Sequence, residues 1–229
     1  MADLIISNGS RAGYRPLRSD LLASNPEASI IAGGQSLMPI LAFRPATPSL
    51  LVDLRRLPGL GNIAVGGDRF RLGALVRWCD IEDDQRLMRA RPLLHAAVAH
   101  VAHYQIRNRG TVREQSSPCR PGRRIARRRG DLRGRNHPLR HGRIAHGTRR
   151  DFFTGPLSTL RQPDDIVTEL HLPKWPRARR WAFRKYARRE GDFALAGILL
   201  FYDEARQGAL SNAHVTVFGS RSQLILPRS

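Results

Sequence analysis

The stretch Ala32-Gly33-Gly34-Gln35-Ser36-Leu37-Met38-Pro39 places two glycines and a hydroxyl residue between two apolar segments. The segment before it, 29–32, predicts a short strand, and 36–43 predicts a short helix. Glycines at such a turn let backbone N–H groups approach an anion, and a helix N-terminus favours negative charge. The stretch has no Walker lysine and is not GxGxxG. Its spacing alone leaves open a phosphate-binding turn and a purely structural turn.

The segments around this turn predict an alternation of strands and helices. Gly66-Gly67-Asp68 lies between two strand patterns, which is typical of a hairpin. Pro92 begins an apolar stripe at helical spacing that predicts a helix to about Tyr104. The acids at positions 80–84 are typical of a solvated turn. The remaining predicted strands are 50–54, 62–65, 70–75, 166–172, 181–186, 193–202 and 213–218.

A second polar cluster, Gln105-Ile106-Arg107-Asn108-Arg109-Gly110-Thr111-Val112, follows the predicted helix. It combines glycine, hydroxyl and guanidinium groups, which suit a pyrophosphate. The alternative is a solvated loop. In their order and separation, the two clusters resemble the FAD-binding medium subunit of the molybdenum hydroxylases, the xanthine dehydrogenase and carbon monoxide dehydrogenase family. The resemblance extends through Leu51-Val52-Asp53-Leu54, Leu72-Gly73-Ala74, Asp151-Phe152-Phe153-Thr154-Gly155-Pro156, Glu169-Leu170-His171-Leu172-Pro173 and Arg184-Lys185-Tyr186-Ala187-Arg188-Arg189.

The resemblance implies an α+β fold. Its first part is a two-subdomain FAD-binding domain of the PCMH/vanillyl-alcohol-oxidase-like type, with subdomains at 1–58 and 59–173. Its second part, 174–229, is the start of a small α/β C-terminal domain, which we expect to be cut short. We also expect 1–19 and 221–229 to lack family character.

The resemblance also implies a site and a function. The residues that would wrap the FAD pyrophosphate are Ala32, Gly33, Gly34, Gln35, Ser36 and Leu37. Gly110 and Thr111 would meet it from the other side, and Lys185 would lie near the flavin. No catalytic side chain and no metal ligand is implied. The chain would be an oxidoreductase subunit that passes electrons from 2Fe-2S clusters through FAD to an external acceptor. Its partners would be a 2Fe-2S small subunit and a molybdopterin-binding large subunit, in a heterotrimer or its dimer.

The charge of the chain is concentrated in one segment. The formal net charge is +20, and 113–150 contributes 13 Arg against two acids, or +11. This segment has no helical or strand period, so we expect it to be disordered. A polyanion partner would explain the charge, which makes an Arg-rich nucleic-acid-binding module the alternative function. The segment 177–189, which interleaves Arg with aromatic residues, leaves the same alternative open beside a half-buried strand.

The same segment is where the resemblance breaks. After Gly110-Thr111-Val112 the family continues with two glycines, a small residue and an Ala-His-Ala-Asp-Pro-Ala-type string, whereas this chain has Arg113-Glu114-Gln115-Ser116. Permitted codons for Arg113 onward, read one nucleotide later, can spell the family string. We therefore hypothesise that 113–150 is out-of-frame translation, and that the chain as written binds FAD weakly or is an inactive, degenerate gene product. The nucleotide sequence across codons 110–152 decides this.

Other features give weaker indications. Two cysteines without CxxC spacing exclude a disulfide framework and a Cys-rich metal site. The longest apolar run is too short to cross a bilayer, and the N-terminus has no signal pattern, so we expect a cytoplasmic protein without a membrane span. His95, His100 and His103 lie on or near the predicted helix without acidic or Cys partners, and ordinary helix histidines are the better interpretation.

Overall fold

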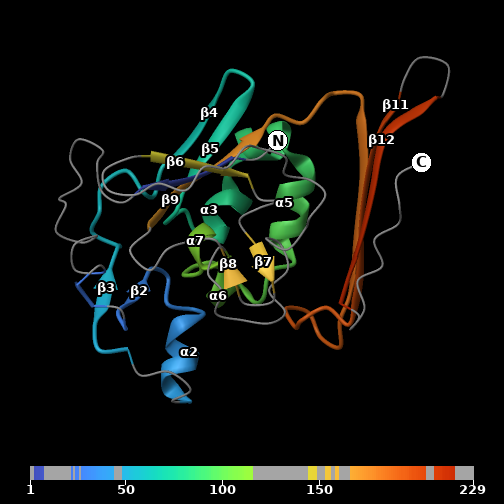
Figure 1. The fold of residues 1–229 in the computed structure, drawn as a ribbon. Helices are drawn as coiled ribbons and strands as arrows, with labels where there is room; N and C mark the ends of the chain where they lie inside the picture. Colours follow the sequence, from blue (N-terminus) through green and yellow to red (C-terminus); the bar gives the residue numbers. More distant parts are fainter. Residues whose placement is uncertain are drawn as a thin grey trace.

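The computed structural model describes residues 3–7, 22, 24–25, 27–43, 48–115, 144–148, 153–155, 158–159, 166–204 and 209–219 (Figure 1). Of the segment for which we hypothesise a shifted frame, 116–143 and 149–150 lie outside these residues. The strands are β1 (Asp3–Ser7), β2 (Ser29–Ile31), β3 (Leu51–Asp53), β4 (Ile63–Gly66), β5 (Arg69–Gly73), β6 (Ile144–Thr148), β7 (Phe153–Gly155), β8 (Ser158–Thr159), β9 (Ile166–Pro173), β10 (Arg179–Tyr186), β11 (Ala196–Glu204) and β12 (Leu210–Phe218). The helices are α2 (Leu37–Ala42), α3 (Trp78–Asp83), α4 (Gln85–Ala90), α5 (Pro92–Ala99), α6 (Tyr104–Arg107) and α7 (Val112–Gln115).

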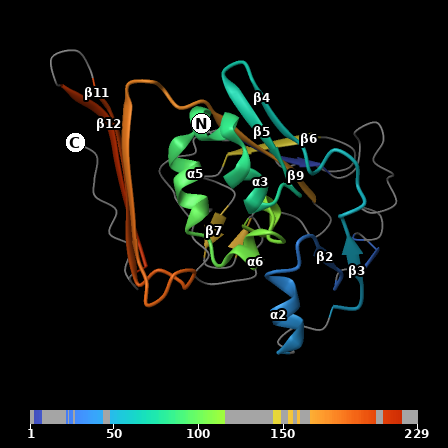
Figure 2. The ribbon, with the colours of Figure 1, turned by 180° about the vertical axis from the view of Figure 1, so that it is seen from behind.

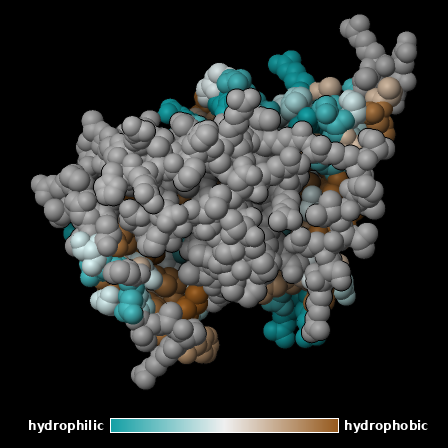
Figure 3. All heavy atoms as spheres, in the orientation of Figure 1, coloured by the Kyte–Doolittle hydropathy of each residue, from teal (hydrophilic) through white to brown (hydrophobic). Residues whose placement is uncertain are grey.

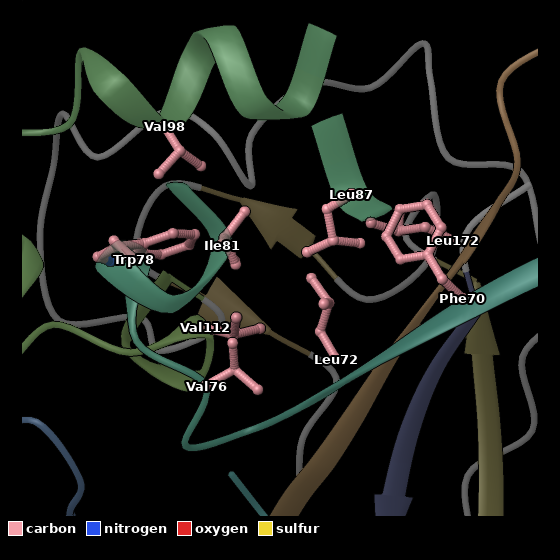
Figure 4. Packing of buried hydrophobic residues seen from close by; sticks show 9 residues of the cluster. All are labelled: Phe70, Leu72, Val76, Trp78, Ile81, Leu87, Val98, Val112 and Leu172. Atoms are coloured by element: carbon pink, nitrogen blue, oxygen red, sulfur yellow. The ribbon is translucent and has the colours of Figure 1, made fainter. Parts of the chain in front are cut away.

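The central layer is a five-stranded antiparallel sheet in the order β4-β5-β9-β1-β6. The alternation in β5 decides which of its faces is buried, because Phe70 and Leu72 point into the core while Arg69 and Arg71 are exposed. Helices α3, α4 and α5 cover this face (Figure 1). Figure 4 shows the resulting core, which consists of Phe70, Leu72, Val76, Trp78, Ile81, Leu87, Val98, Val112 and Leu172.

A smaller unit holds the first glycine turn. Strands β2 and β3 are parallel, with Ile30 opposite Val52, and the connection between them includes α2. A second core lies beneath this pair and includes Leu22, Ile30, Val52, Leu54, Leu60 and Ile166. No side chain of α2 itself is buried, and hydrophobic surface is visible in its part of the molecule in Figure 3.

The third unit is the antiparallel sheet β10-β11-β12, which stands beside α5 in both ribbon views (Figures 1 and 2). Phe183, Leu199 and Phe201 of the sheet pack against Leu93 and Ala97 of α5. The interface therefore uses the face of α5 that the central core leaves uncovered.

Most predicted elements are confirmed, with two exceptions before residue 110. Helix α5 ends at Ala99 and not near Tyr104, because Ala102 has a φ of 50° and a separate helix, α6, follows. The solvated turn predicted at 80–84 is wrong. Asp80 caps the start of α3, and the Asp84 carboxylate accepts hydrogen bonds from two amides at the start of α4.

Within 113–150, two ends have regular structure where the sequence predicted none. Helix α7 includes Arg113 and Glu114, whose side chains are both buried, and β6 pairs with β1. For the described residues at these ends, the expectation of disorder does not match the structure. Among the helices of the described chain, none combines the length and the apolar character needed to cross a membrane.

Candidate functional site

The two glycine-containing clusters of the sequence meet in space. A Cβ placed on Gly33 would overlap the carbonyl group of Arg109 and lie 3.2 Å from the Cα of Gly110. Gly34 has a φ of 79°, a conformation that side chains with a Cβ rarely adopt. Both glycines are therefore required by geometry, the first for close approach and the second for the turn.

The two clusters form two glycine loops, the first at 32–39 and the second at 105–112. The central core holds the second loop in place. A Cβ on Gly110 would lie 2.9 Å from the Ile106 carbonyl oxygen and 3.0 Å from a ring carbon of Trp78. The Trp78 amide donates to the carbonyl of Gly110 at 3.1 Å. Val112 enters the core beside Val76 and Ile81 (Figure 4). The loop is thus fixed on α3 and the start of α7.

A buried carboxylate joins the two loops. The Gln35 amide donates to Oε1 of Glu114 at 2.7 Å, and the Thr111 amide donates to Oε2 of the same residue at 3.3 Å. Glu114 is only 6% exposed. Glu114 is not among the site residues predicted from the sequence, although Thr111 and Glu114 have the spacing of a helix capping box, which could have indicated this contact.

Two buried hydroxyls lie next to these amides in the sequence. Ser36 is 5% exposed and Thr111 is 4% exposed, and within the described part of the chain neither hydroxyl oxygen has a hydrogen-bond partner. Unpartnered buried polar atoms are uncommon and often mark a place where an ion or ligand binds. Backbone amides and hydroxyls on two facing glycine loops are donors suited to phosphate oxygens. The two loops therefore carry donors suited to the pyrophosphate of a dinucleotide such as FAD, and Glu114 accepts from two of their amides.

The guanidinium of Arg107 is not among these donors. It donates to Glu82 at 2.7 Å and to the carbonyl of Ala102 at 3.0 Å, in a half-buried position. The guanidinium group that the sequence offers to a pyrophosphate at Arg107 is thus engaged within the fold. Its contacts hold α6 against α3, which positions the loop that follows.

A second ion pair supports the same loop from the start of α3. Arg77 contacts Asp80 at 2.6 Å and donates to the Asn108 carbonyl at 3.5 Å. Burial opposes ionisation of Asp80, but its hydrogen bonds and charge interaction with Arg77 lower its pKa below the ordinary value. Asp80 is thus ionised at neutral pH and keeps Arg77 oriented toward the loop.

Lys185 lies on β10, and its ammonium group donates to the His100 carbonyl at 3.0 Å. Partial burial lowers its pKa, while the nearby charges of Asp192 and Glu190 raise it. The structure thus brings 32–37 together with 110–111, whereas Lys185 donates to the carbonyl of His100, the residue that follows α5. In the described residues, His, Cys, Asp and Glu side chains form no group of three that could hold a metal.

The strand segment with interleaved arginines is engaged within the protein. Phe183 is buried against α5, and Arg179 pairs with Asp203 at 2.6 Å while lying over the Phe201 ring. Arg180 pairs with Glu204. Of the two alternatives for 177–189, a nucleic-acid-binding segment and a half-buried strand, the structure matches the strand. Neighbouring acids neutralise part of the positive charge of this segment.

Comparison with known proteins places these features in one family. The family described as "FAD binding domain in molybdopterin dehydrogenase" matches residues 18–113. The nicotine 6-hydroxylase medium subunit of Paenarthrobacter nicotinovorans is 34% identical, over 88% of this chain and 70% of that subunit. The carbon monoxide dehydrogenase medium chain of Hydrogenophaga pseudoflava is 30% identical, over 75% of this chain and 60% of that one.

Solved structures show the same relation. A chain of quinoline 2-oxidoreductase from Pseudomonas putida 86 has a TM-score of 0.77 at 29% identity, covering 89% of this chain and 70% of its own. Carbon monoxide dehydrogenase from Hydrogenophaga pseudoflava has a TM-score of 0.77 at 26% identity, with coverages of 94% and 75%. These neighbours confirm the predicted fold class, and the family match confirms FAD as the cofactor. The chain belongs to the family of FAD-binding medium subunits of the molybdenum hydroxylases.

Proposed function

We propose that this chain is the electron-transfer subunit of a molybdenum-containing hydroxylase, acting in the cytoplasm. It would receive electrons from the 2Fe-2S clusters of a small subunit and pass them through FAD to an external acceptor. A molybdopterin-binding large subunit would complete a heterotrimer or its dimer. The observation that carries the proposal is the contact of two glycine loops. It brings together amides and buried hydroxyls that have no partner among the described residues, and both kinds of donor suit a pyrophosphate.

In this proposal the protein binds and orients the cofactor without a catalytic side chain. Amides and hydroxyls of Ala32, Gly33, Gly34, Gln35, Ser36 and Leu37 would wrap one side of the pyrophosphate. Gly110 and Thr111 would contact its other side, and Lys185 would lie near the flavin. FAD, when bound, supplies the ability to accept and release electrons one or two at a time. The residues around it fix its position and keep water away from its phosphates.

We also propose that each structural unit contributes a different part of the FAD site. Subdomain 1–58 supplies the first glycine loop, and subdomain 59–173 supplies the second loop on its helices. Strands β10 and β11 of the unit 174–229 pack on α5, and β10 carries Lys185. The relatives' names describe subunits of a nicotine hydroxylase and of carbon monoxide dehydrogenases, so their substrates differ, and we assign no substrate to this chain.

Flavin absorption tests the proposal directly. We expect the purified chain to show at most a weak two-band flavin spectrum, and a chain with the reading frame restored at codon 113 to hold FAD at high occupancy. Co-expression with iron-sulfur and molybdopterin subunits should allow all three to be purified together. A restored protein that stays colourless with added FAD would show that the cofactor is not bound by these loops.

A further inference from the structure

We infer that Glu114 is an internal anion that occupies the donors of the pyrophosphate site and lowers the affinity of this chain for FAD. This inference rests on the proposed function of the two loops. It goes beyond that function because it says which group of the protein itself accepts from the amides of the site when FAD is absent.

The contacts of Glu114 resemble those that a phosphate group would make. One carboxylate oxygen accepts from the Gln35 amide in the first loop, and the other accepts from the Thr111 amide in the second. Gln35 and Glu114 are 79 positions apart in the chain. The carboxylate therefore bridges the two loops through one oxygen each, at the level of the neighbouring Ser36 and Thr111 hydroxyls.

Charge makes the carboxylate and a pyrophosphate mutually exclusive. Glu114 is almost fully buried, and a second anion on the same amides would have to displace the carboxylate. Like charges in a site with little water repel strongly, and amide donors engaged by one carboxylate are lost to the other ligand. Binding FAD would thus require Glu114 to leave its position. The free energy lost when its hydrogen bonds to Gln35 and Thr111 break would weaken the binding of FAD by the same amount.

A purely structural role for Glu114 predicts the opposite. Thr111 and Glu114 stand at the capping-box positions of α7, and Oε2 makes the return contact to the Thr111 amide. The box is incomplete, because within the described residues the Thr111 hydroxyl has no partner. If Glu114 only stabilised α7, its removal would loosen the second loop and weaken FAD binding. The two roles therefore predict opposite signs for the same substitution.

The experiment compares FAD affinity in the full chain and three variants by quenching of flavin fluorescence. Glu114→Ala removes the internal anion, and Glu114→Gln removes its charge while keeping its shape. Asp68→Asn is the matched control, because it removes one negative charge from a side chain that is 91% exposed at the tip of the β4–β5 hairpin. Inorganic pyrophosphate serves as a competitor in each titration.

We expect Glu114→Ala to bind FAD at least about tenfold more tightly than the unchanged chain, the effect of freeing a charge-assisted hydrogen bond. Glu114→Gln should show a smaller gain and Asp68→Asn none, with pyrophosphate competing in all four chains. Weaker binding in both Glu114 variants would overturn the inference in favour of the capping role. Equal affinity in all four would overturn it and leave the proposed function standing. If none of the four binds FAD, the inference is overturned, and the flavin spectrum of the frame-restored chain then tests the proposed function separately.

Discussion

Gly33 has no room for a side chain, because the backbone of the second loop lies where its Cβ would be. The sequence could indicate that 32–39 and 105–112 each form a polar turn. Spacing alone could not show that they touch, since Gly33 and Arg109 are 76 positions apart in the chain. The contact depends on the packing of Trp78 and Val112 in the central core, which holds the second loop opposite the first.

Substitution of Gly33 tests this contact. We expect Gly33→Ala to push the two loops apart, to destabilise the fold by about 1–3 kcal/mol, as overpacking does, and to reduce FAD affinity in the frame-restored chain. Chemical denaturation and a flavin titration measure the two effects. Gly61→Ala is the matched control, because a Cβ there meets nothing within 4 Å. If the two variants behave alike, the close approach of the loops has no importance for stability or for binding.

Among the elements, those with a clear period could be predicted and those fixed by capping could not. The alternation of 70–75 and the apolar stripe after Pro92 correspond to β5 and α5. Helix α3 was missed because its acids resemble a polar turn. The structure uses Asp80 as a cap and pairs Glu82 with Arg107, so these acids lie at helix ends and in an ion pair. A charge pattern alone does not distinguish these cases.

The contact between α5 and β10 should be sensitive to pH. Partial burial lowers the pKa of His100 below its ordinary value of 6.5; the positive charges of Lys185 and Arg107 lower it further, and Glu190 opposes them. The unfolded chain therefore takes up a proton near pH 6.5, whereas the folded chain does so only at lower pH. The contribution of the neutral ring to stability is present above pH 6.5 and is lost as the pH falls.

We expect the free energy of unfolding to decrease between pH 7 and pH 5.5 in the unchanged chain, and to decrease less in His100→Phe. Phenylalanine keeps a ring against Phe183, whose centroid is 5.2 Å from that of His100, but it cannot be protonated. Urea denaturation at a series of pH values measures the slope for each protein. Identical slopes would show that His100 does not titrate differently in the folded and unfolded states.

At the scale of the whole molecule, the net charge has a local origin. Subtracting the +11 of 113–150 from +20 leaves +9 on the other 191 residues. The family match ends at residue 113, where the sequence departs from the family string. The shifted frame stays a hypothesis, which the nucleotide sequence across codons 110–152 tests. The fold up to α7 is nevertheless complete enough to bring both loops together.

Because both loops come from different parts of the fold, cofactor binding should stabilise the entire molecule. A ligand that binds only the folded state adds about 2.7 kcal/mol at a concentration 100 times its Kd. For a chain of this length we expect this to raise the Tm by roughly 5–11 °C. A thermal melt of the frame-restored chain with FAD should show the increase, and the chain as written should show a smaller one at the same concentration. Riboflavin is the control. It has the isoalloxazine ring but no pyrophosphate, so it offers the two loops no phosphate to bind. An equal increase with riboflavin and FAD would mean that the ring, and not the contact of the two glycine loops with a pyrophosphate, provides the binding energy.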